Sequence, residues 1–84
     1  MTKPSKLYRK LIATPSLIIS FREFEKLLEA AGFVYDRTVG SHRQYVHPLV
    51  PRPLPVQPAN KDAKRYQVRM FLDMVEAHGL SIDE

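Results

Sequence analysis

The sequence predicts an α+β domain in which two helices flank a three-stranded antiparallel sheet, with an extra short helix at the N-terminus. Apolar residues recur at the helical i, i+3, i+4, i+7 spacing in two segments, near residues 24–31 and 68–75. Between these segments lie short extended runs, separated by a glycine turn and a proline-rich link. Consecutive strands with short links pair in antiparallel fashion, so the two apolar helix faces are expected to cover one side of the sheet and leave the other open.

The first two helices are predicted from their spacing and their ends. Apolar residues predict a short helix over Ser5–Ala13, which a following proline ends. The second helix is expected over Phe21–Ala31, because Ser20 and Glu23 have the spacing of a capping box. Gly32 fits the position just past the end of this helix.

Three strands are expected next. The first is predicted over Phe33–Thr38, with Phe33 and Tyr35 on the face that meets the core, and the second over His42–His47. Five of the chain's seven prolines fall in and around the third. Because proline lacks a ladder donor, this strand is expected to be short (Leu54–Gln57) and to lie at an edge or a bulge.

The last helix is predicted by the apolar spacing of residues 68, 71, 72 and 75, and Gly79 marks its end. The polar run Asn60–Asp62 offers side chains that can cap its start. We therefore expect an N-terminal extension at residues 1–19, a main domain at 20–80 and an acidic tail at 81–84.

Composition limits the classes of protein that fit. The chain has 84 residues, enough for one domain with a small core, and it has no cysteine, which excludes disulfides and thiolate metal sites and fits a reducing cytoplasm. No apolar run approaches the roughly 20 residues needed to span a bilayer. The basic N-terminus is not followed by the apolar stretch of a secretory signal.

The distribution of charge says more than the net charge of +4. From Arg37 to Arg69 the chain has seven Lys or Arg residues and one acid, Asp62, whereas residues 70–84 have four acids and no Lys or Arg. A concentrated basic surface attracts polyanions such as nucleic acids. An ordinary solvated surface is the alternative.

The motif Gly40-Ser41-His42 lies where one predicted strand turns into the next. A glycine permits a tight turn with positive φ, and a histidine just past it can be held rigidly and still reach solvent. Histidine is the side chain best suited to proton transfer at neutral pH, so in a basic region it indicates a phosphate-bearing substrate. A hydrogen-bonded surface histidine is the competing interpretation.

Two other chemistries for this motif are disfavoured by strand geometry. Neighbouring residues of a strand point to opposite faces, so Ser41 is not expected to be a nucleophile activated by His42, and we expect it to hydrogen-bond within the turn. His42 and His47 also fall on opposite faces, and catalytic zinc needs three converging ligands. No metal or other cofactor is expected, and His47, before Pro48, is assigned a structural role.

Several segments occur in an order that matches one known family: Leu27–Phe33, Asp36-Arg37, Gly40–Tyr45, His47-Pro48, Leu54–Pro58, Ala63–Val68 and Gly79-Leu80. On these segments the chain resembles the HicA toxins of bacterial toxin–antitoxin systems, over about residues 21–80. The resemblance implies a fold like that of double-stranded-RNA-binding domains. It also implies cleavage of mRNA that blocks translation and growth, His42 as the catalytic residue, and neutralisation by a HicB-like antitoxin.

A ribonuclease without a metal needs a base for the ribose 2′-hydroxyl, an acid for the leaving oxygen, and positive charge near the phosphate. His42 fits either proton role. Many relatives have a histidine where this chain has Gln57, so the acid stays open among water, Tyr45 and a lysine. Gln57 itself fits a hydrogen bond to a base or phosphate, or a solvent-facing strand position. Tyr45 is assigned first to core packing, because it alternates with His42.

The candidate RNA-contacting residues are basic or able to stack on a base, and they are Arg43, Gln57, Lys61, Lys64, Arg65, Tyr66 and Arg69. Tyr66 has two interpretations, stacking on an unpaired base or packing at the helix start. Gly40 and Ser41 are expected to position His42. The alternatives to an enzyme are a non-catalytic RNA-binding module and an antitoxin-binding interaction domain on the same fold.

Overall fold

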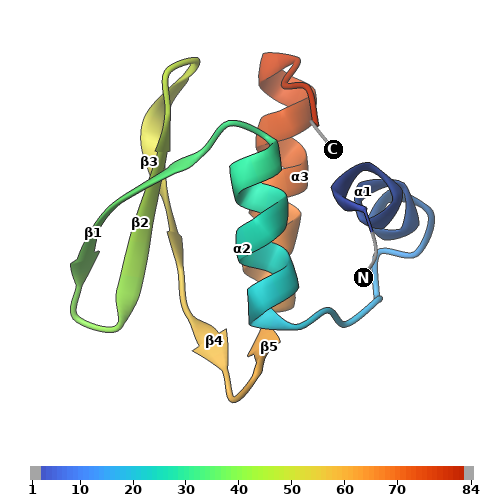
Figure 1. Cartoon of the computed structure of the whole chain (residues 1–84), viewed down its shortest axis with the longest axis horizontal. Helices are drawn as coiled ribbons and strands as arrows, with labels where there is room; N and C mark the ends of the chain where they lie inside the picture. Colours follow the sequence, from blue (N-terminus) through green and yellow to red (C-terminus); the bar gives the residue numbers. More distant parts are fainter. Residues whose placement is uncertain (1–2, 83–84) are drawn as a thin grey trace.

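The computed structural model describes residues 3–82. The elements in chain order are α1 (Pro4–Ala13), α2 (Phe21–Ala30), β1 (Val34–Val39), β2 (His42–His47), β3 (Val50–Val56), β4 (Pro58–Ala59), β5 (Asp62–Ala63) and α3 (Arg65–His78). In Figure 1, α2 and α3 lie between the three-stranded sheet and α1. The predicted α+β class is confirmed. Part of the predicted acidic tail, residues 83–84, lies outside the described residues.

Helix α2 begins with the predicted capping box. The Ser20 hydroxyl accepts a hydrogen bond from the Glu23 backbone N–H at 3.1 Å, and the Glu23 carboxylate accepts one from the Ser20 N–H at 3.3 Å. Two orphan amides are thereby satisfied where the helix starts. Phe24, Leu27 and Leu28 are fully buried on the inner face of α2. The local sequence therefore determines where this helix begins and which face it buries.

The sheet has the order β1-β2-β3, with both pairs antiparallel. β2 alternates between a buried face containing Tyr45 and the opposite, open face. β1 behaves differently, because all six of its residues are exposed. The prediction that Tyr35 meets the core is wrong: its side chain is 51% exposed and its hydroxyl lies 2.6 Å from the Thr38 hydroxyl. The helices pack against β2 and β3, and β1 lies beyond the area that the helices cover (Figure 1).

Strand β3 is longer than predicted, spanning Val50–Val56 instead of Leu54–Gln57. It lies at an edge of the sheet, as its prolines required, and the pairing register shifts between Tyr45 and His47 of β2. Pro53 and Pro55 are two residues apart, so in an extended chain both place their missing amide on the same side. An edge strand tolerates this arrangement because one of its sides has no partner.

The prediction that Asn60–Asp62 caps the last helix is wrong: Asn60 and Lys61 make the turn of a β4–β5 hairpin, and Asp62 is the first residue of β5. Asn60 has a positive φ of 60°, which asparagine tolerates better than most residues. The Lys61 carbonyl accepts the Phe21 N–H at 2.8 Å, which ties the hairpin to the start of α2. Helix α3 begins after Lys64 without a side-chain cap.

The end of α3 is as predicted. Gly79 takes the left-handed conformation, with φ 61°, and its N–H donates to the Val75 carbonyl. Inside the core, the ring of Phe71 on α3 lies 5.9 Å from the rings of Phe24 and Phe33, between their centroids. Within residues 3–82, none of the helices has the length and apolar character needed to cross a membrane.

Candidate functional site

His42 is the first residue of β2 and directly follows the Gly40-Ser41 turn, in which Gly40 has a φ of 61°. It is half-buried, in contrast to the buried Tyr45. Side chains alternate along a strand, so His42 shares its face with Gln44 and Val46, opposite the face that Tyr45 presents to the core. The turn therefore presents the histidine on the open side of the sheet.

Gln57, the residue that follows β3, contacts this turn through its side chain. The Ser41 hydroxyl donates to the side-chain oxygen of Gln57 at 3.4 Å, a long bond, across the strands and not within the turn as predicted. Arg43 pairs with Val56, so continuing the antiparallel register by one residue sets His42 opposite Gln57. Gln57 therefore lies across from His42, on the segment that follows β3.

Gln67 on α3 was missed by sequence reasoning. Its side chain is 1% exposed and is the buried polar side chain among residues 3–82. Its Oε1 accepts the backbone N–H of Gln57 at 3.0 Å, and its Nε2 donates to the hydroxyl of Tyr66 at 3.3 Å. Buried amides require such partners. The signal available in the sequence was a glutamine one residue before Val68, on the apolar face of a helix.

A shallow hollow of about 400 Å³ lies on the open face of the sheet. Its lining residues come from all three strands and are Asp36, Arg37, Val39, Gln44, Val46 and Pro53. Val39 is the cross-strand partner of His42, so the hollow lies directly beside the histidine. Arg37, which sequence reasoning did not include among the site residues, also lines the hollow, where its exposed side chain pairs with Asp36 at 3.1 Å.

His47 has the structural role predicted for it. The Leu49 N–H donates to its Nδ1 at 3.0 Å, so the ring proton is on Nε2, which donates to the Ala31 carbonyl at 3.0 Å. The ring also packs edge-on against Phe33, with centroids 5.1 Å apart. Both nitrogens are therefore engaged on the helix side of the sheet, away from His42. Within residues 3–82 no cluster of three metal-ligating side chains occurs.

Glu25 on α2 holds two side chains of β2. Its Oε2 accepts from Arg43 Nη1 at 2.6 Å and from the Tyr45 hydroxyl at 2.7 Å, and the Arg43 guanidinium lies 5.2 Å from the centre of the Phe21 ring. Burial, and then the hydrogen bond to Glu25, raise the pKa of Tyr45 above its usual range. The hydrogen bond to Glu25 raises the pKa of Arg43. The core role of Tyr45 is confirmed, and Arg43 points to the face opposite His42.

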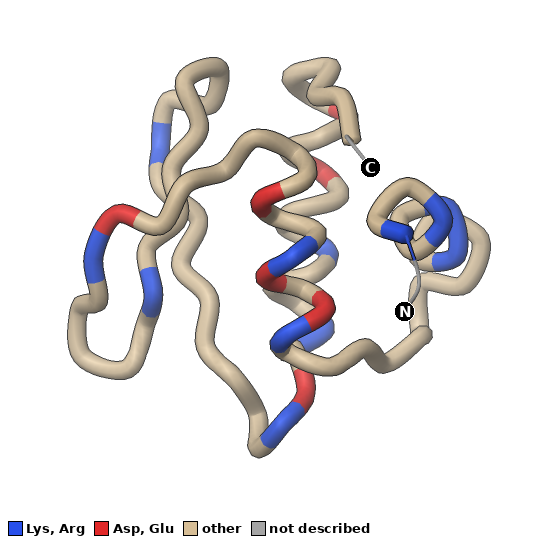
Figure 2. Tube along the Cα trace, viewed as in Figure 1, with Lys and Arg blue, Asp and Glu red and all other residues tan. Residues whose placement is uncertain are grey.

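The other basic candidates are placed together at one end of the domain. They are Lys61, Lys64, Arg65 and Arg69, in the β4–β5 hairpin and the first turns of α3 (Figure 2). Tyr66 lies among them and is 57% exposed. Of its two interpretations, packing at the helix start does not fit, and the ring is available for stacking.

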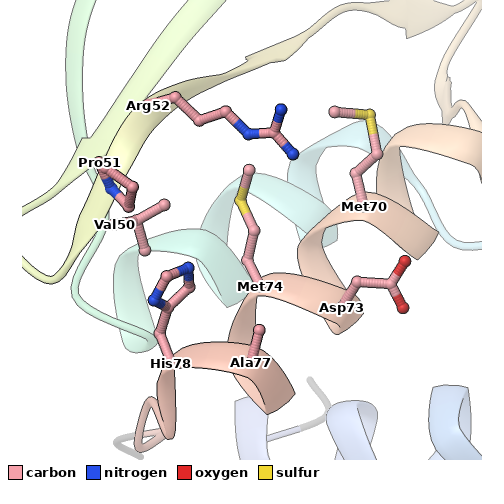
Figure 3. A pocket seen from close by; sticks show the side chains of 8 residues that line it. All are labelled: Val50, Pro51, Arg52, Met70, Asp73, Met74, Ala77 and His78. Carbon is pink, nitrogen blue, oxygen red and sulfur yellow. The ribbon is translucent and has the colours of Figure 1, made fainter.

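A separate pocket of about 170 Å³ lies between β3 and α3 (Figure 3). Apolar side chains, including Val50, Met70 and Met74, form part of its wall, and Arg52 extends from β3 toward α3 across it. His78, at the end of α3, also lines it. None of the predicted site residues does, so the pocket is not part of the candidate site.

Comparison with protein families gives a match to the model described as HicA toxin of bacterial toxin-antitoxin, over residues 21–77. The match begins at the first residue of α2 and ends one residue before the end of α3. Helix α1 and the connector after it therefore lie outside the matched region. No curated protein and no solved structure matches the chain.

Proposed function

Because the chain belongs to the HicA family of toxins of bacterial toxin–antitoxin systems, we propose that it is a metal-independent endoribonuclease that cleaves mRNA in the cytoplasm. Cleavage would block translation and arrest growth until a HicB-like antitoxin neutralises the toxin. Family membership establishes a toxin with an antitoxin partner. The reaction, its residues and the identity of the antitoxin are the proposal.

The position of His42 is the observation that carries the proposal. The His42 side chain is half-buried, and the residue directly follows the Gly40-Ser41 turn, in which Ser41 contacts Gln57. It borders an open hollow large enough to admit part of a substrate. A catalytic base must be held in place and still reach the proton that it removes. We assign His42 the proton transfer at the ribose 2′-hydroxyl.

Gln57 is suited to contact the phosphate next to His42. Its side-chain oxygen already accepts from Ser41, which leaves the Nε2 protons as donors toward an anionic oxygen. Such a donor stabilises charge that develops on the phosphate in the transition state. We therefore propose that Gln57 binds the reacting phosphate, although it cannot supply a proton as a histidine would.

The proposed reaction also needs an acid that donates a proton to the leaving oxygen. Tyr45 donates its hydroxyl to Glu25 on the helix side of the sheet, away from His42. Water and a lysine therefore remain as the candidates for this acid. Lys61, Lys64, Arg65 and Arg69 are proposed to bind flanking phosphates, whereas Arg43 is engaged by Glu25.

The test is expression of the wild type and of His42→Ala without an antitoxin, with growth and RNA integrity measured. His78→Ala is the matched control, since His78 is exposed at the far end of α3. We expect growth arrest and RNA cleavage with the wild type and the control, and neither with His42→Ala. If His42→Ala cleaves RNA as the wild type does, the catalytic assignment is wrong.

Purified protein separates the remaining alternatives. Cleavage should persist in EDTA, and loss of cleavage there would contradict a metal-independent mechanism. RNA binding without cleavage by the wild type would favour the binding module over the enzyme. Co-expression with a HicB-like protein should restore growth, and a failure to restore it would remove that protein as the antitoxin.

A further inference from the structure

We propose that a groove between the α1–α2 connector and the start of α3 binds an unpaired nucleotide of the RNA, with its base on Tyr66 and its phosphates on Arg65 and Arg69. The groove has a volume of about 460 Å³ and is lined by Pro15, Ser16, Arg65, Tyr66 and Arg69. This inference rests on the proposed function, because it adds a subsite for the same substrate.

The charges of the groove favour an anion. Arg65 and Arg69 are four residues apart on α3, so their side chains lie on the same side of the helix. Neither side chain forms an ion pair or hydrogen bond within residues 3–82, in contrast to Arg43, and the described lining residues include no carboxylate. Two unpaired guanidinium groups next to each other match the geometry of phosphate oxygens.

Tyr66 supplies a stacking surface that is already oriented. Its ring is 57% exposed, while its hydroxyl accepts the Gln67 Nε2 hydrogen bond at 3.3 Å. Gln67 is itself buried and held by the Gln57 amide. Stacking of a base on an aromatic side chain strengthens binding, and it requires a base that is not already stacked in a duplex. The groove therefore selects single-stranded RNA.

Gln67 and Gln57 together connect the groove with the turn before His42. Gln67 bonds Tyr66 on one side and the Gln57 amide on the other, and Gln57 in turn accepts the Ser41 hydroxyl. These hydrogen bonds link the Tyr66 ring to the segment that lies next to the turn before His42, although the last bond, at 3.4 Å, is long. A nucleotide on Tyr66 would therefore lie on the side of the domain that leads, through Gln67 and Gln57, to the His42 turn.

One wall of the groove comes from outside the family-matched region. Pro15 and Ser16 belong to the connector after α1, whereas the match covers residues 21–77. Helix α1 anchors this connector, since Leu7 and Leu11 are buried in the core cluster. The N-terminal extension therefore completes a substrate subsite in addition to covering the core.

The experiment measures binding of a labelled single-stranded RNA of about 12 nucleotides, and of the same sequence as a duplex, to His42→Ala protein, which prevents cleavage. Tyr66→Ala should weaken binding of the single strand about tenfold or more, with little effect on the duplex, and Tyr66→Phe should keep most of the affinity. Far-ultraviolet circular dichroism confirms that each variant is folded.

Ser16→Glu tests the contribution of the connector, because it places a carboxylate opposite the two arginines. Its control is Ser81→Glu, the same change at an exposed serine beyond the other end of α3. We expect a several-fold loss of single-strand affinity from Ser16→Glu and none from Ser81→Glu. Single-strand affinity unchanged in both Tyr66→Ala and Ser16→Glu overturns the subsite, as does equal weakening for both RNA forms.

These results are independent of the proposed reaction. Absence of cleavage by the wild type overturns the enzyme and leaves the binding data as they are. Cleavage that depends on His42, together with insensitivity of binding to Tyr66 and Ser16, overturns the groove alone. Failure of the His42→Ala protein to bind either RNA also overturns it.

Discussion

The backbone N–H of Gln57 donates to the buried side-chain oxygen of Gln67 at 3.0 Å, which joins the segment after β3 to the first turn of α3. Gln57 also accepts the hydroxyl of Ser41, so the two glutamines connect the helix with the turn before His42. A buried amide that satisfies a backbone donor orders both elements. The rigidity of the candidate site therefore depends in part on Gln67, which takes no part in the proposed reaction.

Gln67→Met should destabilise the protein by about 1–3 kcal/mol, because it leaves the partly buried Gln57 N–H without an acceptor. Urea denaturation measures this change in the free energy of unfolding. The matched control is Gln44→Met on the open face of the sheet, where we expect a change within about 0.5 kcal/mol. Equal effects of the two substitutions would show that the Gln57–Gln67 bond contributes nothing specific.

Ser41→Ala should retain most of the RNA cleavage, with a loss of less than about tenfold, because its hydroxyl makes only a long hydrogen bond of 3.4 Å to Gln57. A serine nucleophile would instead lose activity by several orders of magnitude when its hydroxyl is removed. The measurement is the single-turnover rate on a defined RNA, compared with His42→Ala. A loss of cleavage rate as large as that of His42→Ala would indicate that the Ser41 hydroxyl takes part in the reaction.

Tyr45→Phe should cost about 1–2 kcal/mol of stability at neutral pH, since Glu25 loses a buried donor but keeps Arg43. Because burial and Glu25 raise the pKa of Tyr45 above its unfolded value of about 10, the folded state favours the protonated phenol. That contribution is complete below about pH 10 and declines as the pH rises toward the higher folded value.

The difference in stability between wild type and Tyr45→Phe should therefore shrink above about pH 10, as followed by thermal unfolding. Titration of other groups affects both proteins and cancels in the comparison. The cleavage rate of Tyr45→Phe at neutral pH should stay close to the wild-type value. A large fall in that rate with an unchanged fold would make Tyr45 the missing acid.

Gly32→Ala should destabilise the protein by about 3 kcal/mol or more. Its φ is 96°, and a Cβ there would lie 2.8 Å from Nε2 of His47, which is held by the Ala31 carbonyl and the Leu49 amide. Gly79→Ala is the control, with φ 61° and no atom within 4 Å of the added Cβ, and should cost about 1–2 kcal/mol. Similar midpoints in urea for both variants would contradict this role of His47.

Much of the fold was predictable because its signals are local. The Ser20–Glu23 capping box, the apolar face of α2 and the Gly79 end of α3 each involve residues three or four apart, which interact before any tertiary structure is considered. The errors occurred where packing decides. Tyr35 alternates like a core residue, but β1 extends past the helices and leaves it in solvent.

The sequence by itself determined the order of the three helices and of the strands of the main sheet, but not the β4–β5 hairpin. It also determined the turn that presents His42 and the segments that place the chain among the HicA toxins. The tertiary structure decided which candidate residues meet. Arg43 pairs with Glu25, and Gln57 lies across from His42. The Gln67 side chain accepts a hydrogen bond from the Gln57 backbone N–H. The tertiary structure also folded the connector of α1 against the arginines of α3. These contacts join residues far apart in the chain. Periodicity reports only on neighbours along one helix or strand, so it does not predict such contacts.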